Sequence, residues 1–191
     1  MYKRQMSLQK VFCFLAVGVS AAIFIYSLGI ITDLYDALYM TMRNPNDLTK
    51  TSVEGSFVYY EMQGFNQQFM LSGLGLLLVS LLLFLTNTHI RRRYYVGNYA
   101  AIGLWSAAAV GVSVWAHVQI EYFKGQFLKL DFEALRKHAD LWKTLYTEST
   151  FWFDVHYVLF ALLLVTAALL AANLFWKRSL MKQEAALLRQ G

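Results

Sequence analysis

Two histidines and a glutamate stand out, because their side chains can bind metal ions while most of the residues around them are apolar. His117 and Glu121 lie four residues apart in "SVWAHVQIEYF", and His156 lies in "WFDVHYVLF". A spacing of four places two side chains on one face of a helix. Imidazole and carboxylate groups suit Zn, Fe, Mn or Cu ions. The sequence therefore predicts a divalent-metal site at His117, Glu121 and His156.

Two other kinds of chemistry remain open for the same residues. His117 and His156 can serve as the axial ligands of a haem b between neighbouring helices, which requires inward imidazoles at matched depth. A histidine and a carboxylate at the mouth of a transport pathway would attract cations and titrate near neutral pH. The chain has no H-E-x-x-H motif. The spacing alone does not decide between these alternatives.

Further polar residues are expected beside this site, at the outer ends of the helices. Ionisable groups inside membrane spans are rare and usually mark a pathway, a ligand or a partner. The expected outer polar cluster consists of Asp33, Glu61, Asn66 and Asp154. Asp154 lies about 200° around its helix from His156, so these two side chains are not expected to face one site. No counterpart is expected in the inner half of the helices.

The elements that must position these residues are long apolar segments. Of 191 residues, 58% are hydrophobic and 15% are charged, whereas a soluble domain has about 25% charged residues. A helix needs about 20 apolar residues to cross a hydrocarbon core about 30 Å thick. Backbone groups in hydrocarbon must be paired internally, which favours helices. The predicted fold is all-α, a single membrane domain with four transmembrane helices at residues 11–32, 66–87, 97–120 and 151–176.

The distribution of Lys and Arg predicts the orientation of these helices. Ten of the seventeen basic residues lie in the N-terminus, the loop 88–96 and the tail 177–191. The positive-inside rule places these segments, and so both termini, in the cytoplasm. In the loop, Arg91, Arg92 and Arg93 are expected to meet anionic lipid headgroups. The plasma membrane is the expected location.

The two remaining connections, 33–65 and 121–150, are then outer loops. In the second, apolar residues recur at helical spacing from Phe132 through Leu135 to Ala139. Asp131 is a suitable N-cap for this segment. Glu133 and Lys137 are placed as an i,i+4 ion pair. The sequence predicts a short amphipathic extracellular helix between the third and fourth spans.

Small residues recur every four positions along the third span, at Gly103, Ala107 and Gly111. Such a stripe lets helices approach closely in lipid. At 100° per residue, His117 and Glu121 fall within about 40° of Gly103. We therefore expect this stripe to form an interhelix packing face that turns the histidine and the glutamate into the bundle.

Several classes of function receive no support. The chain has no glycine-rich phosphate loop or nucleophile elbow, and its one cysteine, Cys13, lies in a predicted span. The net charge of +5 is explained by the membrane flanks, so nucleic acid is not an expected partner. The leading expectation is a non-enzymatic transport component: an oligomeric channel or carrier, or an accessory subunit of a larger membrane complex. The alternative is a redox protein that binds haem b or a metal through His117 and His156.

Overall fold

A computed structural model describes residues 2–41, 53, 55, 57–88, 95–142 and 147–190, and in the first helix the side chains of residues 3–28. The described residues are helical apart from short connections. The helices are α1 (Tyr2–Thr41), α2 (Phe57–Asn87), α3 (Tyr95–Phe127), α4 (Phe132–Trp142) and α5 (Phe151–Gln190).

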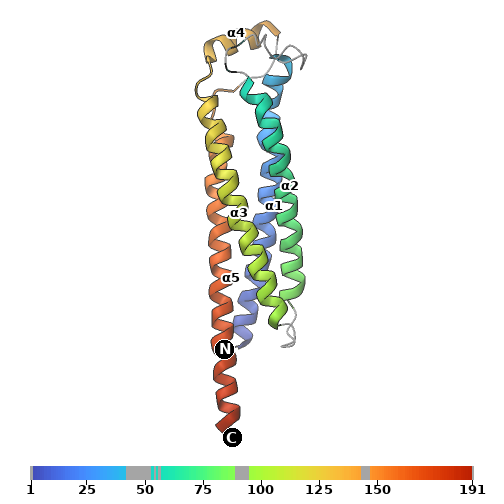
Figure 1. The fold of residues 1–191 in the computed structure, drawn as a ribbon, viewed down its shortest axis with the longest axis vertical. Coiled ribbons are helices and arrows are strands. Elements are labelled where there is room, and N and C mark those ends of the chain that lie inside the picture. The colour runs from blue at the N-terminus through green and yellow to red at the C-terminus, as the bar shows by residue number, and fades with distance from the viewer. Residues whose placement is uncertain are drawn as a thin grey trace.

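The four long helices lie side by side, and the short α4 crosses one end of them (Figure 1). Helix α1 packs on α2 and α5, and α3 packs on α2 and α5, so each long helix has two main neighbours. Both termini lie at the end opposite α4, where α5 continues beyond the other helices (Figure 1). These ends are called the α4 end and the terminal end below.

Helices α1, α2, α3 and α5 are each long and apolar enough to cross a membrane. With 40 residues, α1 and α5 each extend about 60 Å, about twice the thickness of a hydrocarbon core. The predicted spans are therefore the apolar parts of longer helices. In α5 the helix continues past its span because the flanking segment, which includes "QEAALL", consists of strong helix formers.

Large side chains fill the space between the four helices. Trp105, Phe69, Ile23 and Leu163 are each 0% exposed and belong to one core cluster. The indole Nε1–H of Trp105 donates to Ser20 Oγ at 3.2 Å, which satisfies its buried polar atom. Among the described residues, the middle of the molecule is therefore a packed core.

The small-residue stripe of α3 is not part of that core. Gly103, Ala107 and Gly111 are exposed, and a Cβ atom built on either glycine would meet no atom within 4 Å. The buried face of α3 carries Trp105 and Ile120 instead. This corrects the expectation that the stripe packs helices together within the chain. Large side chains make more van der Waals contacts with neighbouring helices than small ones do, and the indole of Trp105 also finds its hydrogen-bond partner there, so the face with Trp105 turns inward.

The short helix between α3 and α5 forms as predicted. Asp131 Oδ1 accepts the backbone N–H of Ala134 at 3.0 Å, which is the N-cap hydrogen bond, and Lys137 Nζ lies 2.6 Å from Glu133 Oε1. Leu135 and Ala139, on the apolar face of α4, are buried. Its apolar face thus covers the α4 end of the long helices.

We predict that Gly73→Ala destabilises the protein relative to Gly75→Ala. A Cβ atom at Gly73 would lie 3.2 Å from Phe24 Cα, a backbone atom of α1, whereas one at Gly75 meets nothing within 4 Å. Both changes raise the helix propensity equally. The difference in stability between the two variants therefore measures the cost of overpacking at Gly73, which is about 1–3 kcal/mol. Thermal unfolding of both variants in detergent measures it. Equal midpoints would contradict this α1–α2 contact.

Candidate metal site

The site is built around His156, which is 0% exposed. Its ring contacts the rings of Tyr157 and Phe160, with centroids 4.1 and 5.3 Å away. On the neighbouring helix α1, the Tyr26 hydroxyl donates to the carbonyl of Trp152 at 2.6 Å and ties α1 to the first turn of α5. Helix packing therefore fixes the position of this imidazole before any ligand is considered.

A backbone contact determines which nitrogen of His156 carries the proton. Nδ1 lies at hydrogen-bonding distance from the carbonyl oxygen of Phe153. A carbonyl can only accept, so Nδ1 is the donor, and the neutral ring has its lone pair on Nε2. This nitrogen faces α3. Metal-binding histidines commonly have their second nitrogen held by a backbone carbonyl in this way.

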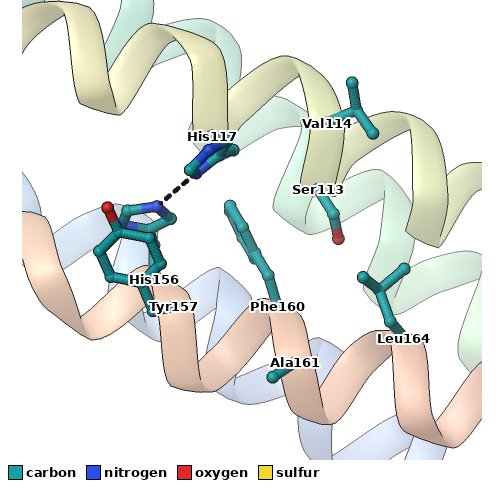
Figure 2. Close-up of a pocket in the computed structure, with 8 residues that line it drawn as sticks. All are labelled: Ser113, Val114, His117, His156, Tyr157, Phe160, Ala161 and Leu164. Carbon is teal, nitrogen blue, oxygen red and sulfur yellow. Dashed lines mark hydrogen bonds between the residues drawn. The ribbon is translucent and has the colours of Figure 1, made fainter.

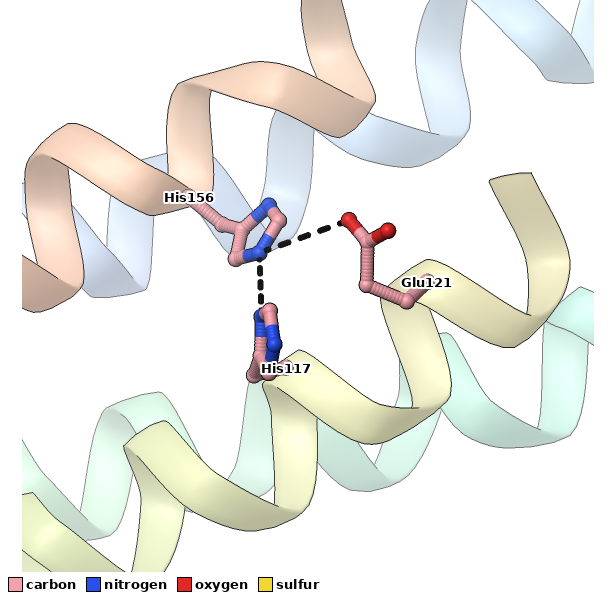
Figure 3. A group of neighbouring side chains, drawn as sticks. All are labelled: His117, Glu121 and His156. Carbon is pink, nitrogen blue, oxygen red and sulfur yellow. Dashed lines mark hydrogen bonds and ion pairs between the residues drawn. The ribbon is translucent and has the colours of Figure 1, made fainter. Parts of the chain in front are cut away.

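The other two predicted ligands lie close to Nε2 of His156 (Figure 3). His117 Nδ1 lies 2.8 Å from His156 Nε2, and Glu121 Oε1 lies 3.9 Å from the same nitrogen. One ligand atom from each of the three residues lies within 4.8 Å of the others. The structure thus brings together His117, Glu121 and His156, although His156 is far from the other two in sequence.

The carboxylate of Glu121 is itself held in place. The Tyr157 hydroxyl donates to Glu121 Oε1 at 2.7 Å across the α3–α5 interface. Next to this pair, Lys124 Nζ contacts Asp154 Oδ1, and the Thr150 hydroxyl donates to Asp154 Oδ2 at 2.8 Å. Polar interactions therefore join α3 to α5 on the α4 side of the three ligands.

The spacing of the ligand atoms suits a small divalent ion after minor adjustment. Metal–nitrogen and metal–oxygen distances of about 2.0–2.2 Å in a tetrahedral site put neighbouring ligand atoms about 3.3 Å apart. The observed separations of 2.8 and 3.9 Å lie on either side of this value. The two imidazoles would have to separate slightly and the carboxylate to approach them to create three-ligand coordination, with a fourth position open as in catalytic zinc sites.

A haem does not fit the same histidines. Two axial nitrogens lie on opposite faces of the macrocycle, about 4 Å apart if each bond is about 2.0 Å. Here the imidazoles touch directly, with 2.8 Å between His117 Nδ1 and His156 Nε2 and 5.1 Å between ring centroids. The two rings would have to separate and admit a macrocycle between α3 and α5. The geometry therefore favours an ion over a haem.

His117 is the most exposed of the three ligands, while Glu121 is intermediate and His156 is buried. The sequence predicted that His117 points into the helix bundle with the small-residue stripe. It lies instead at the edge of the buried face of α3, where that helix meets α5. A prediction based on one helix cannot place this edge, because the position of the neighbouring helix decides it.

Among the other predicted polar residues, those whose side chains the structure describes are not ligands of this site. Asp154 pairs with Lys124 and does not share the inward face of His156, as the helical angle predicted. Glu61 is exposed on α2. Asn66 is 1% exposed, and neither polar atom of its side chain has a hydrogen-bond partner within the described part of the chain. The side chain of Asp33 lies outside the described residues, as do Arg91, Arg92 and Arg93.

Sequence reasoning missed Tyr157, Lys124 and Ser113 near the site. Ser113 and His117 are spaced by four, as are His117 and Glu121, so the helical pattern would have revealed Ser113. Tyr157 offers no such signal, because only the position of α5 beside α3 brings its hydroxyl to Glu121.

Buried polar groups also occur at the terminal end, where none was expected. Gln5 donates to Gln9 at 2.9 Å, and Gln9 donates to Asn87 at 2.8 Å, which links α1 to α2. Lys177, predicted to begin the cytoplasmic tail, is only 3% exposed within α5. This corrects the expectation that the polar interior is confined to the other end.

The chain matches no family model, no curated protein and no solved structure, so its function is inferred from its own residues.

Proposed function

We propose that this protein is an integral membrane protein that binds one divalent transition-metal ion at His117, Glu121 and His156. Two imidazoles and one carboxylate favour Zn²⁺ over the hard ions Mg²⁺ and Ca²⁺. The ion would sit between α3 and α5 near the α4 end, with one coordination position left for water or a ligand.

The observation that carries this proposal is the support given to the ligands. His156 is oriented by the Phe153 carbonyl, and Glu121 is oriented by the Tyr157 hydroxyl. Such outer contacts fix the tautomer and the direction of a metal ligand. A single histidine used only for packing would not need a second histidine and a carboxylate within 4.8 Å of it.

Elemental analysis of the purified protein tests the proposal. The full chain is extracted in a mild detergent, loaded with Zn²⁺ and freed of excess ion by gel filtration. About one bound ion per chain is expected, and the joint variant His117→Ala/His156→Ala should retain almost none. His89→Ala and His138→Ala serve as matched controls, since neither residue is one of the three ligands. Metal retained equally by all variants would refute the site.

We predict that Tyr157→Phe weakens metal binding by about 10-fold or more. The change removes the hydroxyl that donates to Glu121 Oε1 and leaves the ring, and loss of an outer-shell partner lowers metal affinity about 10–100-fold. Titration with Co²⁺, followed by its visible absorption, measures the affinity. Tyr122→Phe is the control, because Tyr122 is similarly exposed on the adjacent helix. Equal affinities for both variants would show that Tyr157 does not support the carboxylate.

The membrane topology completes the proposal. We propose a four-helix transmembrane bundle with both termini in the cytoplasm of a plasma-membrane protein, which makes α4 an extracellular cap. The support comes from the four apolar helices and from the excess of Lys and Arg in the segments at the terminal end. There, Arg91, Arg92 and Arg93 would contact anionic lipid headgroups. Cysteines introduced at Ser149 and Ser179 and labelled from outside intact cells test this, since only the first should react.

A role as a transport component is the second candidate. The packed core supports an assembly of several chains, or a role as an accessory subunit, over a pore within one chain. The exposed stripe at Gly103, Ala107 and Gly111 offers a face where another helix can approach closely. Zn²⁺ flux into proteoliposomes that contain a zinc-sensitive dye tests transport, with Glu121→Gln as the variant. Flux no greater than in protein-free liposomes would exclude transport by this chain alone.

A further inference from the structure

A groove begins at the two histidines and runs along the α3–α5 interface towards the middle of the helices (Figure 2). It has a volume of about 330 Å³. His117 and His156 line its polar end, and Val114, Phe160 and Leu164 line the rest. An aliphatic chain would fit this apolar part. A ligand that fills the whole groove must be an amphiphile.

Ser113 is the one polar group in the apolar part of the groove. It is 4% exposed, and its Oγ has no hydrogen-bond partner among the residues that the structure describes. The hydroxyls of Ser72, Ser80 and Thr166 donate to a carbonyl one turn back in their own helix, whereas Ser106 Oγ, also on α3, lacks a partner among the described residues as Ser113 does. Ser113 instead points from α3 towards Leu164 on the other wall (Figure 2). A buried donor without a partner is unfavourable, so a ligand acceptor would complete it.

The groove has polar residues at one end and apolar walls at the other, in the same order as the head groups and acyl chains of one bilayer leaflet. Glu121, Lys124 and Asp154 lie on the α4 side of the histidines, where the helices approach the membrane surface. The apolar walls extend from there into the spans. A lipid that enters from the surrounding bilayer would therefore place its head at the histidines and its acyl chain along Phe160 and Leu164.

Charge selects the kind of head group. A divalent ion held by Glu121 and two neutral imidazoles keeps one net positive charge, and Lys124 is already paired with Asp154. An anionic oxygen therefore suits the open coordination position. Ser113 lies four residues, about 6 Å, from His117 along α3. A second oxygen several bonds beyond the anion would reach its hydroxyl.

We propose that the groove binds an anionic glycerophospholipid with its phosphate on the metal ion. The acyl ester carbonyl accepts the hydrogen bond of the Ser113 hydroxyl, and the acyl chain occupies the apolar walls. This inference rests on the proposed metal site and names the ligand of its open position.

The test removes the Ser113 hydroxyl from the protein and the ester carbonyls from the lipid, separately and together. The protein in non-ionic detergent is loaded with Co²⁺, and its visible absorption is followed during titration with dioctanoyl phosphatidic acid. The same titration uses the ether-linked analogue, which lacks the ester carbonyls. Ser113→Ala should weaken binding of the ester lipid by about 2- to 10-fold and leave binding of the ether lipid unchanged. Ser72→Ala, whose hydroxyl bonds to its own helix, should affect neither lipid.

A second variant tests the groove itself. Ala161→Leu, at an exposed position on the groove wall, should weaken both lipids and leave Co²⁺ binding unchanged. If Co²⁺ binds but its spectrum does not respond to either lipid, or Ser113→Ala weakens both lipids equally, the lipid inference is overturned and the metal site stands. If no Co²⁺ binds, the proposed function fails and this inference fails with it.

Discussion

His156→Ala should lower the affinity for Zn²⁺ or Co²⁺ by more than about 100-fold. Loss of an outer-shell partner alone costs about 10–100-fold, and this change removes a ligand together with its fixed orientation. His156 should matter more than His117, because it is 0% exposed and held by the Phe153 carbonyl. The binding isotherm of Co²⁺, read from its visible absorption, gives the affinities of the wild type and of both single variants.

A loss of folding must be separated from a loss of binding in this experiment. His156→Gln keeps a polar side chain of similar size in the buried position and should preserve thermal stability better than His156→Ala. His138→Ala changes a histidine of α4 that is not one of the three ligands and should bind Co²⁺ as the wild type does. If His156→Gln is stably folded and binds Co²⁺ with unchanged affinity, the metal site described above does not exist.

Trp105→Ala should destabilise the folded protein by about 3–5 kcal/mol, the usual cost of truncating a large buried aromatic residue. Trp105 is 0% exposed in the centre of the core. The change also leaves the Ser20 hydroxyl without the indole that donates to it. Denaturant unfolding in mixed micelles measures the loss, and the remaining four of the five tryptophans still report by fluorescence.

Leu78→Ala provides the control for this prediction. Leu78 is 57% exposed on α2, so its truncation opens no cavity and should cost less than about 1 kcal/mol. Trp105→Phe should fall between the two, because it keeps most of the volume and loses the hydrogen bond to Ser20. A similar loss for Trp105→Ala and Leu78→Ala would mean that the core is not centred on Trp105.

The secondary structure followed closely from the sequence. Four apolar segments, each too long and too uniform for a soluble domain, required helices. The α4 helix was equally clear, because Asp131 caps it and Glu133 and Lys137 lie one turn apart. These features depend on residues close together in the chain. Local periodicity and local hydrogen bonding therefore suffice to predict them.

The orientation of α3 did not follow in the same way. The stripe of Gly103, Ala107 and Gly111 indicated one packing face, and Trp105 and Ile120 occupy the actual one. Both faces are apolar, so periodicity alone cannot choose between them. The choice depends on which side chains fit against α2 and α5, and that information lies in other parts of the chain.

The sequence by itself determined the helices, their apolar character and the three residues whose side chains can bind a metal ion. Only the tertiary structure decided that His156 faces inward and meets His117 and Glu121, and that Tyr157 supports the carboxylate. The reason is physical. A helix forms from contacts within a few residues, whereas a site shared by two helices depends on how each is rotated and shifted against the other.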